Sequence, residues 1–351
     1  MRETDAYFRF LAQRAQRYAG SGTVLRITVC GYRVRLVFAG LVPPDLMKRS
    51  LGWLTDREGR EADETVCVRE DETADETVYI WEDDLALLKR ESMIPEEKQS
   101  RKYHRTETFD ILFPGMTQRL AVRDSRCRVT WVCFAEGGGI PWSYMNKPFV
   151  NELQWWLRDR FFLLHGGMAG TGGTGALILG PSGAGKSTLA MACLSAGMDY
   201  AAEDYVLISK TGGLAAELVF QTGYLTPYSL EKLPDLKPYV LQYAEEKGKY
   251  LLDLQAFRNR FRSMRPEMIV YPHPCGCASP AFVRAQSVPS FMAALTSTAR
   301  QIKSQQFFTD AFMGIFHRLK DLPAYEMRLT EDPLKNADAL KQFLSRREDT
   351  R

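Results

Sequence analysis

The sequence predicts an α/β protein in which a P-loop catalytic domain follows a second, smaller α+β domain. An apolar run at 176–179 is typical of a buried strand. The segment GPSGAGKS at 180–187 matches the G-x-x-x-x-G-K-[ST] pattern in full. A helical apolar pattern at 187–196 follows, and Gly197 ends it. We predict an N-terminal accessory or substrate-docking domain over 1–145 and the catalytic domain over 146–351.

Composition and charge limit the classes of function. The chain has 351 residues, of which 45% are hydrophobic and 25% charged, with a formal net charge of +3. This balance argues against nucleic acid or a membrane as a partner. No apolar run approaches the roughly 20 residues that span a bilayer, and the N-terminus lacks a signal-peptide apolar segment. The expected location is cytoplasmic.

The seven cysteines do not suggest a disulfide framework, because their number is odd and their spacing is scattered. Cys275-Gly-Cys277 with His273 nearby is either a metal half-site or a turn.

The N-terminal region reads as alternating short helices and strands. Apolar spacing predicts helices at 6–19 and 44–54, a hairpin at 23–38 around Cys30-Gly31, and an acidic loop at 57–75. Four further strands are predicted at 78–81, 109–113, 120–122 and 128–134, and the glycine run at 137–141 reads as a linker. We find no compact catalytic constellation in this region.

The catalytic region begins with a helix and a strand. The segment 146–160 carries an apolar helical stripe, and 161–165 reads as a buried strand that ends in His165. We interpret the glycine-rich stretch 166–173 as a turn that leads into the P-loop strand. This arrangement would bring His165 near the phosphate loop.

The P-loop pattern predicts that the chain binds a nucleoside triphosphate. Small residues let backbone N–H groups curl around phosphate oxygens, and the helix N-terminus adds partial positive charge. Lys186 should reach the β- and γ-phosphates, and Ser187 should offer its hydroxyl to Mg²⁺. The expected cofactors are therefore ATP and Mg²⁺. The predicted nucleotide-binding residues are Gly180, Pro181, Ser182, Gly183, Ala184, Gly185, Lys186, Ser187 and Thr188.

Two adjacent carboxylates, Glu203 and Asp204, follow the P-loop helix at the junction of two short apolar segments. One carboxylate of such a pair can orient an acceptor hydroxyl or take its proton, and the other can hold Mg²⁺. A solvated Glu-Asp turn is the alternative interpretation.

The segment from LLHGG through GPSGAGKS to AAEDYVLI resembles the catalytic domain of HPr kinase/phosphorylase and its kinase-like relatives. That family has a histidine-glycine pair fifteen residues before the P-loop and an acidic pair seventeen residues after the P-loop lysine. His165 and Gly180, and Lys186 and Glu203, have these separations. The resemblance covers about 148–210, and softer matches follow at 222–234, 266–272 and 323–333. They are similar to HPr-kinase-related proteins of bacterial gene clusters, including kinases that modify ribosomal peptides.

The resemblance implies a fold related to PEP carboxykinase and specific roles for the matching residues. Glu203 takes the place of the aspartate that acts as general base, and His165 the place of its histidine partner. Asp204 matches the second acidic residue, with a metal role, and Lys186 and Ser187 match the phosphate and Mg²⁺ contacts. Glu in place of the usual Asp moves the first carboxylate out by one methylene. The glycine-rich segment linked to phosphorolysis in the family is missing, which favours a kinase over a reversible enzyme and makes HPr itself a doubtful substrate.

Later segments offer weaker signals. The mixed loop at 222–234 is either a cover over the nucleotide or acceptor or an inert surface loop, and its residues to test are Tyr224, Tyr228 and Lys232. Positive charge concentrates at Lys247, Lys249, Arg258, Arg260, Arg262 and Arg265. This cluster either receives the acceptor's acidic groups or the ATP phosphates, or it forms a solvated helix face. Helices at 288–301, 304–320 and 333–347 and a strand at 325–329 should complete the core without bearing on substrate.

The first functional hypothesis is an ATP- and Mg²⁺-dependent serine kinase whose partner is a peptide or small protein, such as a ribosomal peptide precursor. A small-molecule kinase, acting on free serine for example, keeps the same chemistry. A non-catalytic, nucleotide-dependent regulatory module is the alternative of a different class. A homo-oligomer is left open.

Overall fold

The computed structural model describes residues 2–19, 22–52, 74–92, 94, 103–113, 119–285, 287–301 and 307–348. The chain divides into two compact units, one from Met1–Leu157 and the other from Arg158–Ile302 with Phe307–Arg351. Both units combine helices with a mixed sheet, so the predicted α/β class is confirmed in this coarse form.

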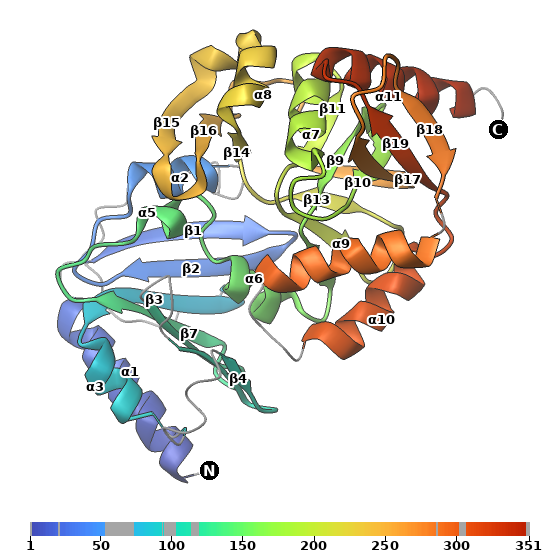
Figure 1. Cartoon of the computed structure of the whole chain (residues 1–351). Coiled ribbons are helices and arrows are strands. Elements are labelled where there is room, and N and C mark those ends of the chain that lie inside the picture. The colour runs from blue at the N-terminus through green and yellow to red at the C-terminus, as the bar shows by residue number, and fades with distance from the viewer. Residues whose placement is uncertain are drawn as a thin grey trace. The chain divides into compact units, whose positions relative to one another are not determined.

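Seven described strands of the first unit form one sheet in the order β1-β2-β3-β7-β6-β5-β4 (Figure 1). The β1–β2 hairpin turns at Cys30 and Gly31, both with positive φ, as its two-residue loop requires. The strand bounds are β1 (Thr23–Val29), β2 (Tyr32–Phe38), β3 (Glu76–Asp83), β4 (Tyr103–Arg105), β5 (Phe109–Leu112), β6 (Arg119–Asp124) and β7 (Val129–Ala135).

Helix α1 (Arg2–Ala19), which the sequence predicts at 6–19, packs apolar side chains against one face of this sheet. Tyr7, Phe8 and Leu11 are buried there in one cluster with Trp81 and Trp131. The other described helices of the unit are α2 (Asp45–Ser50), α3 (Leu85–Arg90), α5 (Trp142–Met145) and α6 (Val150–Leu157). The predicted acidic loop at 57–75 lies outside the described residues except for its last two positions.

The border between the units falls after Leu157 and not after residue 145 as predicted. Helix α6 belongs to the first unit because its side chains bond to that unit's sheet. Glu152 is fully buried and forms an ion pair with Arg119 at 2.8 Å. The Trp156 indole donates a hydrogen bond to the Thr130 hydroxyl at 3.1 Å.

The second unit is built on a nine-stranded mixed sheet. Seven of its strands follow the order β11-β9-β10-β17-β13-β12-β8, and the other two branch from β17, with β19 paired to β17 and β18 paired to β19. The long strand β17 runs parallel to both β10 and β19. The bounds are β8 (Phe161–Leu164), β9 (Gly167–Thr171), β10 (Thr174–Ile178), β11 (Asp199–Ala202), β12 (Val206–Ser209), β13 (Ala216–Leu218), β17 (Ser263–Pro274), β18 (Ala281–Arg284) and β19 (Ala324–Leu329).

A separate three-stranded sheet, β14-β16-β15, and several helices complete the second unit. Figure 1 shows α7 and α11 side by side, in agreement with the residue contacts between them. The bounds are β14 (Thr222–Leu225), β15 (Val240–Ala244), β16 (Lys249–Asp253), α7 (Lys186–Ser195), α8 (Pro227–Lys232), η1 (Pro234–Tyr239), η2 (Glu245–Lys247), α9 (Ser287–Gln301), α10 (Phe307–Leu319) and α11 (Pro333–Glu348). Within the described residues, no helix has both the length and the apolar character that crossing a bilayer requires.

Two secondary-structure predictions for this unit are wrong. The glycine-rich stretch 166–173 is mostly strand β9, and only Gly172-Gly173 form a turn. Its glycines allow close backbone approach, since a Cβ on Gly170 would lie 1.8 Å from the Thr174 carbonyl oxygen. The predicted loop at 222–234 contains β14 and α8, because Thr226 caps the helix and Pro227 begins it.

Candidate active site

The P-loop lies between strand β10 and helix α7, as predicted. Gly183 and Gly185 have φ of +83° and +91°, a region that other residues rarely adopt. Gly185 directly precedes α7, so the first backbone N–H groups of the helix belong to Lys186, Ser187 and Thr188. These groups have no acceptor within the helix and are available to an anion.

Lys186 is held inside the loop. Its side chain is 7% exposed, and its Nζ donates hydrogen bonds to the carbonyl oxygens of Gly180 and Pro181, both at 2.9 Å. Burial lowers the pKa of Lys186 to about 8 from an ordinary value of 10.5, while the nearby Asp204 and Glu203 carboxylates act in the opposite direction. The ammonium therefore stays mostly protonated at neutral pH and carries a positive charge into the site.

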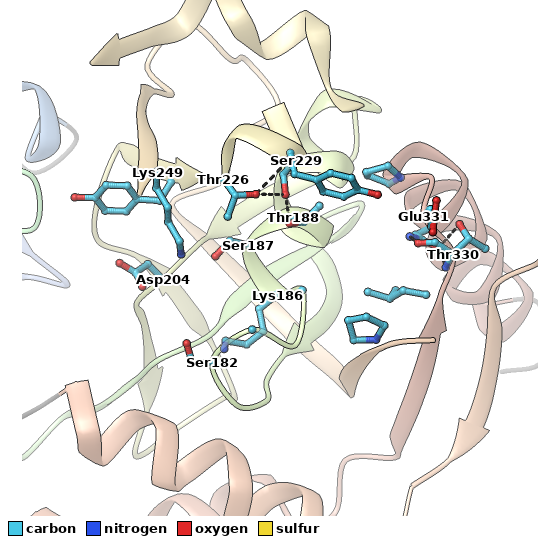
Figure 2. A pocket seen from close by; sticks show the side chains of 18 of the residues that line it. Ser182, Lys186, Ser187, Thr188, Asp204, Thr226, Ser229, Lys249, Thr330 and Glu331 are labelled. Carbon is cyan, nitrogen blue, oxygen red and sulfur yellow. Dashed lines mark hydrogen bonds between the residues drawn. The ribbon is translucent and has the colours of Figure 1, made fainter. Parts of the chain in front are cut away.

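A cavity of about 750 Å³ opens along this loop, entirely within the second unit. Figure 2 shows Ser182, Lys186, Ser187 and Thr188 along its middle. Of the predicted nucleotide-binding residues, Ser182, Gly183, Gly185, Lys186, Ser187 and Thr188 line the cavity, whereas Gly180, Pro181 and Ala184 are not among the lining residues.

His165 and Asp204 line the same cavity and face each other. The His165 Nδ1 and Asp204 Oδ1 atoms are 3.2 Å apart, within ion-pair distance, although His165 Nδ1 has no partner that meets hydrogen-bond criteria. We therefore treat the pair as an electrostatic contact. The predicted approach of His165 to the phosphate loop is present, and its closest carboxylate partner is Asp204.

Asp204 has an unusual backbone. Its φ is +73°, and the Tyr205 N–H donates to the Glu203 carbonyl oxygen at 2.9 Å, which closes a three-residue turn around it. A non-glycine residue in such a turn is strained, and strain of this kind collects at functional sites. The turn aims the Asp204 side chain at the cavity.

Glu203, the neighbouring carboxylate, does not line the cavity. Its side chain is 3% exposed, and its Oε2 accepts a hydrogen bond from the Tyr224 N–H at 3.3 Å. The family resemblance implies that Glu203 is the base and that Asp204 has a metal role. The structure instead brings Asp204 to the cavity and uses Glu203 to join the acidic turn to β14.

A chain of hydroxyl groups links α8 to the P-loop helix. The Ser229 hydroxyl lies 2.8 Å from that of Thr188 and 2.9 Å from that of Thr226, as the dashed lines in Figure 2 mark. Tyr224 and Tyr228 also line the cavity, whereas Lys232 does not and has its Nζ 5.7 Å from the Tyr228 ring centroid.

The predicted basic cluster is divided by the fold. Lys247 and Lys249, at the β15–β16 hairpin, line the cavity. Arg260 donates instead to the backbone oxygens of Phe257 and Gln255, and Arg265 pairs with Glu267 at 2.7 Å. Arg258 and Arg262 are exposed and do not line the cavity.

One end of the cavity was not anticipated from sequence. It is lined by the ends of β17 and β19, the segments that follow them and the first turn of α11, with residues Pro274, Gly276, Leu329, Thr330, Glu331, Pro333 and Asn336. The expectation that the C-terminal elements bear only on the core is therefore wrong. The available signal was Asp332-Pro333, which marks a helix start, but only the fold places that start at the cavity.

The proposed Cys275–Cys277 half-site gains no further ligands. Among the described residues, no group of three or more His, Cys, Asp or Glu side chains has an arrangement that would hold a metal ion. Both thiol groups lie 3.5 Å from the Leu329 carbonyl oxygen, so this pair forms part of a turn against β19.

No family model matches the chain, and no curated protein matches it. Among solved structures, the HPr(Ser) kinase/phosphatase from Coxiella burnetii aligns with a TM-score of 0.30 and 11% sequence identity, over 54% of this chain and 97% of that chain. At so low a TM-score, the likeness supports no argument about fold or function.

Proposed function

We propose that the protein is a phosphotransferase that moves the γ-phosphoryl group of ATP, with Mg²⁺, to a hydroxyl group of an acceptor. One observation carries the proposal: the P-loop lysine and the His165–Asp204 pair line one cavity. A module that only binds nucleotide needs the first feature but not the second.

Lys186 would meet the charge of the transferred phosphoryl group. Its ammonium is buried in the loop and bonded to carbonyl oxygens that a phosphate would replace. Electrostatic stabilisation of this kind is stronger in a desolvated site than in water.

Asp204 would accept the acceptor's hydroxyl proton. As the acceptor oxygen forms its bond to the γ-phosphorus, the bond from that phosphorus to the bridging oxygen breaks, and ADP leaves with the electron pair. His165 lies 3.2 Å from the Asp204 carboxylate and would orient it. Glu203 would act as a positioning residue through its bond to the Tyr224 backbone.

The residues present also fit Mg²⁺, which prefers oxygen donors. The Ser187 hydroxyl and the Asp204 carboxylate line the same cavity and would hold the ion, which when bound neutralises phosphate charge. Asp204 would then either ligate the metal or take the proton, and these two roles predict different kinetics.

We further propose that the acceptor is a serine of a peptide or small protein. The sequence resemblance to HPr-kinase-related proteins is the support for this finer statement. Free serine and other small hydroxyl compounds are the competing acceptors.

The test measures phosphate transfer to serine-containing peptides and to free serine by mass shift, with Asp204→Asn beside the wild type. We expect a loss of about 10²- to 10⁴-fold in kcat and unchanged ATP affinity if Asp204 is the base. A variant whose main defect is a raised Mg²⁺ requirement would make Asp204 a metal ligand. Asp235→Asn, on an exposed acid of η1 outside the cavity, is the matched control.

The variant Glu203→Gln tests which of the two carboxylates acts as the base. Because Glu203 does not line the cavity, we expect its variant to retain more activity than Asp204→Asn. The opposite order would return the base role to Glu203. ATP binding with no transfer to any acceptor, in the wild type, would favour the regulatory module.

A further inference from the structure

The cavity has two chemically different ends. Figure 2 shows Asp204 and Lys249 on one side of the P-loop and Thr330 and Glu331 on the other, with Lys186 between them. The first end carries both signs of charge. At the second end, Glu331 is the charged side chain among the described lining residues.

A bound triphosphate has a fixed direction in this cavity. The inference rests on the proposed function, in which the γ-phosphoryl group lies beside Asp204. The P-loop holds the β- and γ-phosphates near Lys186. The nucleoside must then extend away from Asp204, toward the end that holds Thr330 and Glu331.

The second end has a fixed apolar floor. Leu329 is 7% exposed, and Pro274 and Pro333 line the cavity with it. The Leu329 carbonyl oxygen accepts from the Cys275 N–H at 3.4 Å and lies near both cysteine thiols, which joins the 274–277 turn to β19. A flat apolar ring is the kind of group that such a floor accommodates.

Hydrogen bonds from Asn336 hold the turn that carries Glu331. Asn336 is 4% exposed, and its Oδ1 accepts from the Thr330 N–H at 2.9 Å and from the Thr330 hydroxyl at 3.1 Å. Its Nδ2 donates to the Thr330 carbonyl oxygen at 3.1 Å, and Asp332 caps α11 on the other side. Glu331 itself is exposed. The carboxylate is therefore presented from a defined backbone.

A carboxylate at this position selects its ligand by charge. It would repel phosphate and any acidic acceptor, but it accepts hydrogen bonds from hydroxyl groups. Nucleotide sites on other folds use an acidic residue on the ribose hydroxyls in this way.

We infer that the Leu329–Pro333 turn and the Pro274–Gly276 turn form the nucleoside subsite, with the base against Leu329 and Pro274 and the Glu331 carboxylate accepting from the ribose hydroxyls. Glu331 is then a specificity residue for ribonucleotides, and Asn336 positions it.

The test compares equilibrium binding of ATP, 2′,3′-dideoxy-ATP and tripolyphosphate to the full chain. Hydrogen bonds to a charged group contribute about 1.5 to 3 kcal/mol, so the wild type should bind ATP at least about tenfold more tightly than dideoxy-ATP. Glu331→Ala should weaken ATP binding by about this factor and should not weaken the binding of dideoxy-ATP or tripolyphosphate. Glu326→Ala, on strand β19 just before this turn and outside the cavity, is the matched control.

The outcomes separate the two proposals. If ATP binds and Glu331→Ala leaves its affinity unchanged, the subsite is wrong and the proposed function stands. An equal loss of ATP and tripolyphosphate binding in Glu331→Ala would also overturn the subsite. If neither ATP nor tripolyphosphate binds the wild type, the proposed function itself fails.

Discussion

The buried charge of Lys186 should lower the free energy of unfolding at neutral pH. Replacing Lys186 by methionine should therefore stabilise the protein at that pH. The ammonium is 7% exposed, and burial lowers its pKa to about 8 from 10.5. Methionine has a similar length, carries no charge and needs no hydration. Lys186→Met should therefore remove a buried charge and abolish tight ATP binding at the same time.

The magnitude follows from the change in the pKa of Lys186. A shift from 10.5 to about 8 corresponds to about 3 kcal/mol against the native state at pH 7. The native state releases this proton at a lower pH than the unfolded chain does. The penalty is therefore complete below about pH 8 and is relieved as the pH rises toward 10.5. In Lys186→Met, the stability gained by removing the charge is reduced by about 1 to 2 kcal/mol, because the two hydrogen bonds to Gly180 and Pro181 are lost.

The assay is denaturant unfolding of the wild type and Lys186→Met at pH 7 and pH 10. At pH 7 we expect the variant to be more stable by about 1 to 2 kcal/mol. Between pH 7 and pH 10 the difference should move by about 2.5 kcal/mol in favour of the wild type, and the lost hydrogen bonds do not enter this change. A stability difference that is the same at both pH values would refute the reasoning.

Three further perturbations test the packing and the pair at the cavity wall. Gly170→Ala should destabilise the second unit by at least about 3 kcal/mol in a thermal melt, because its Cβ meets backbone at 1.8 Å, whereas Gly213→Ala, with open space around it, should be neutral. Arg119→Ala should cost the first unit about 3 to 5 kcal/mol in denaturant unfolding by leaving Glu152 buried without this ion pair, and an unchanged midpoint would contradict that account. His165→Asn should lower kcat and leave the ATP dissociation constant unchanged, and a selective loss of ATP affinity would argue against an orienting role.

Much of the fold was predictable because local rules decide it. Helix α1, the β1–β2 hairpin and the β10–P-loop–α7 unit follow from apolar spacing, turn residues and one complete motif. Strand β9 was missed because its glycines read as a turn. These glycines let the backbone of β9 approach that of β10 closely. This role becomes visible only once the two strands are seen to pair.

The candidate site was also predictable from sequence only in part. From strand order and the family resemblance, the sequence predicted that His165, Lys186 and the acidic pair lie near one another. It did not decide which carboxylate faces the cavity, because that depends on the Asp204 turn and on the bond from Glu203 to Tyr224.

By itself, the sequence determined that this chain carries the complete P-loop pattern with acidic residues downstream, because those features lie within short stretches of chain. The tertiary structure alone decided that Asp204 reaches the cavity and that Glu331 lies at its far end. The physical reason is that a side chain's direction depends on the segments packed against it, and here those segments come from distant parts of the sequence.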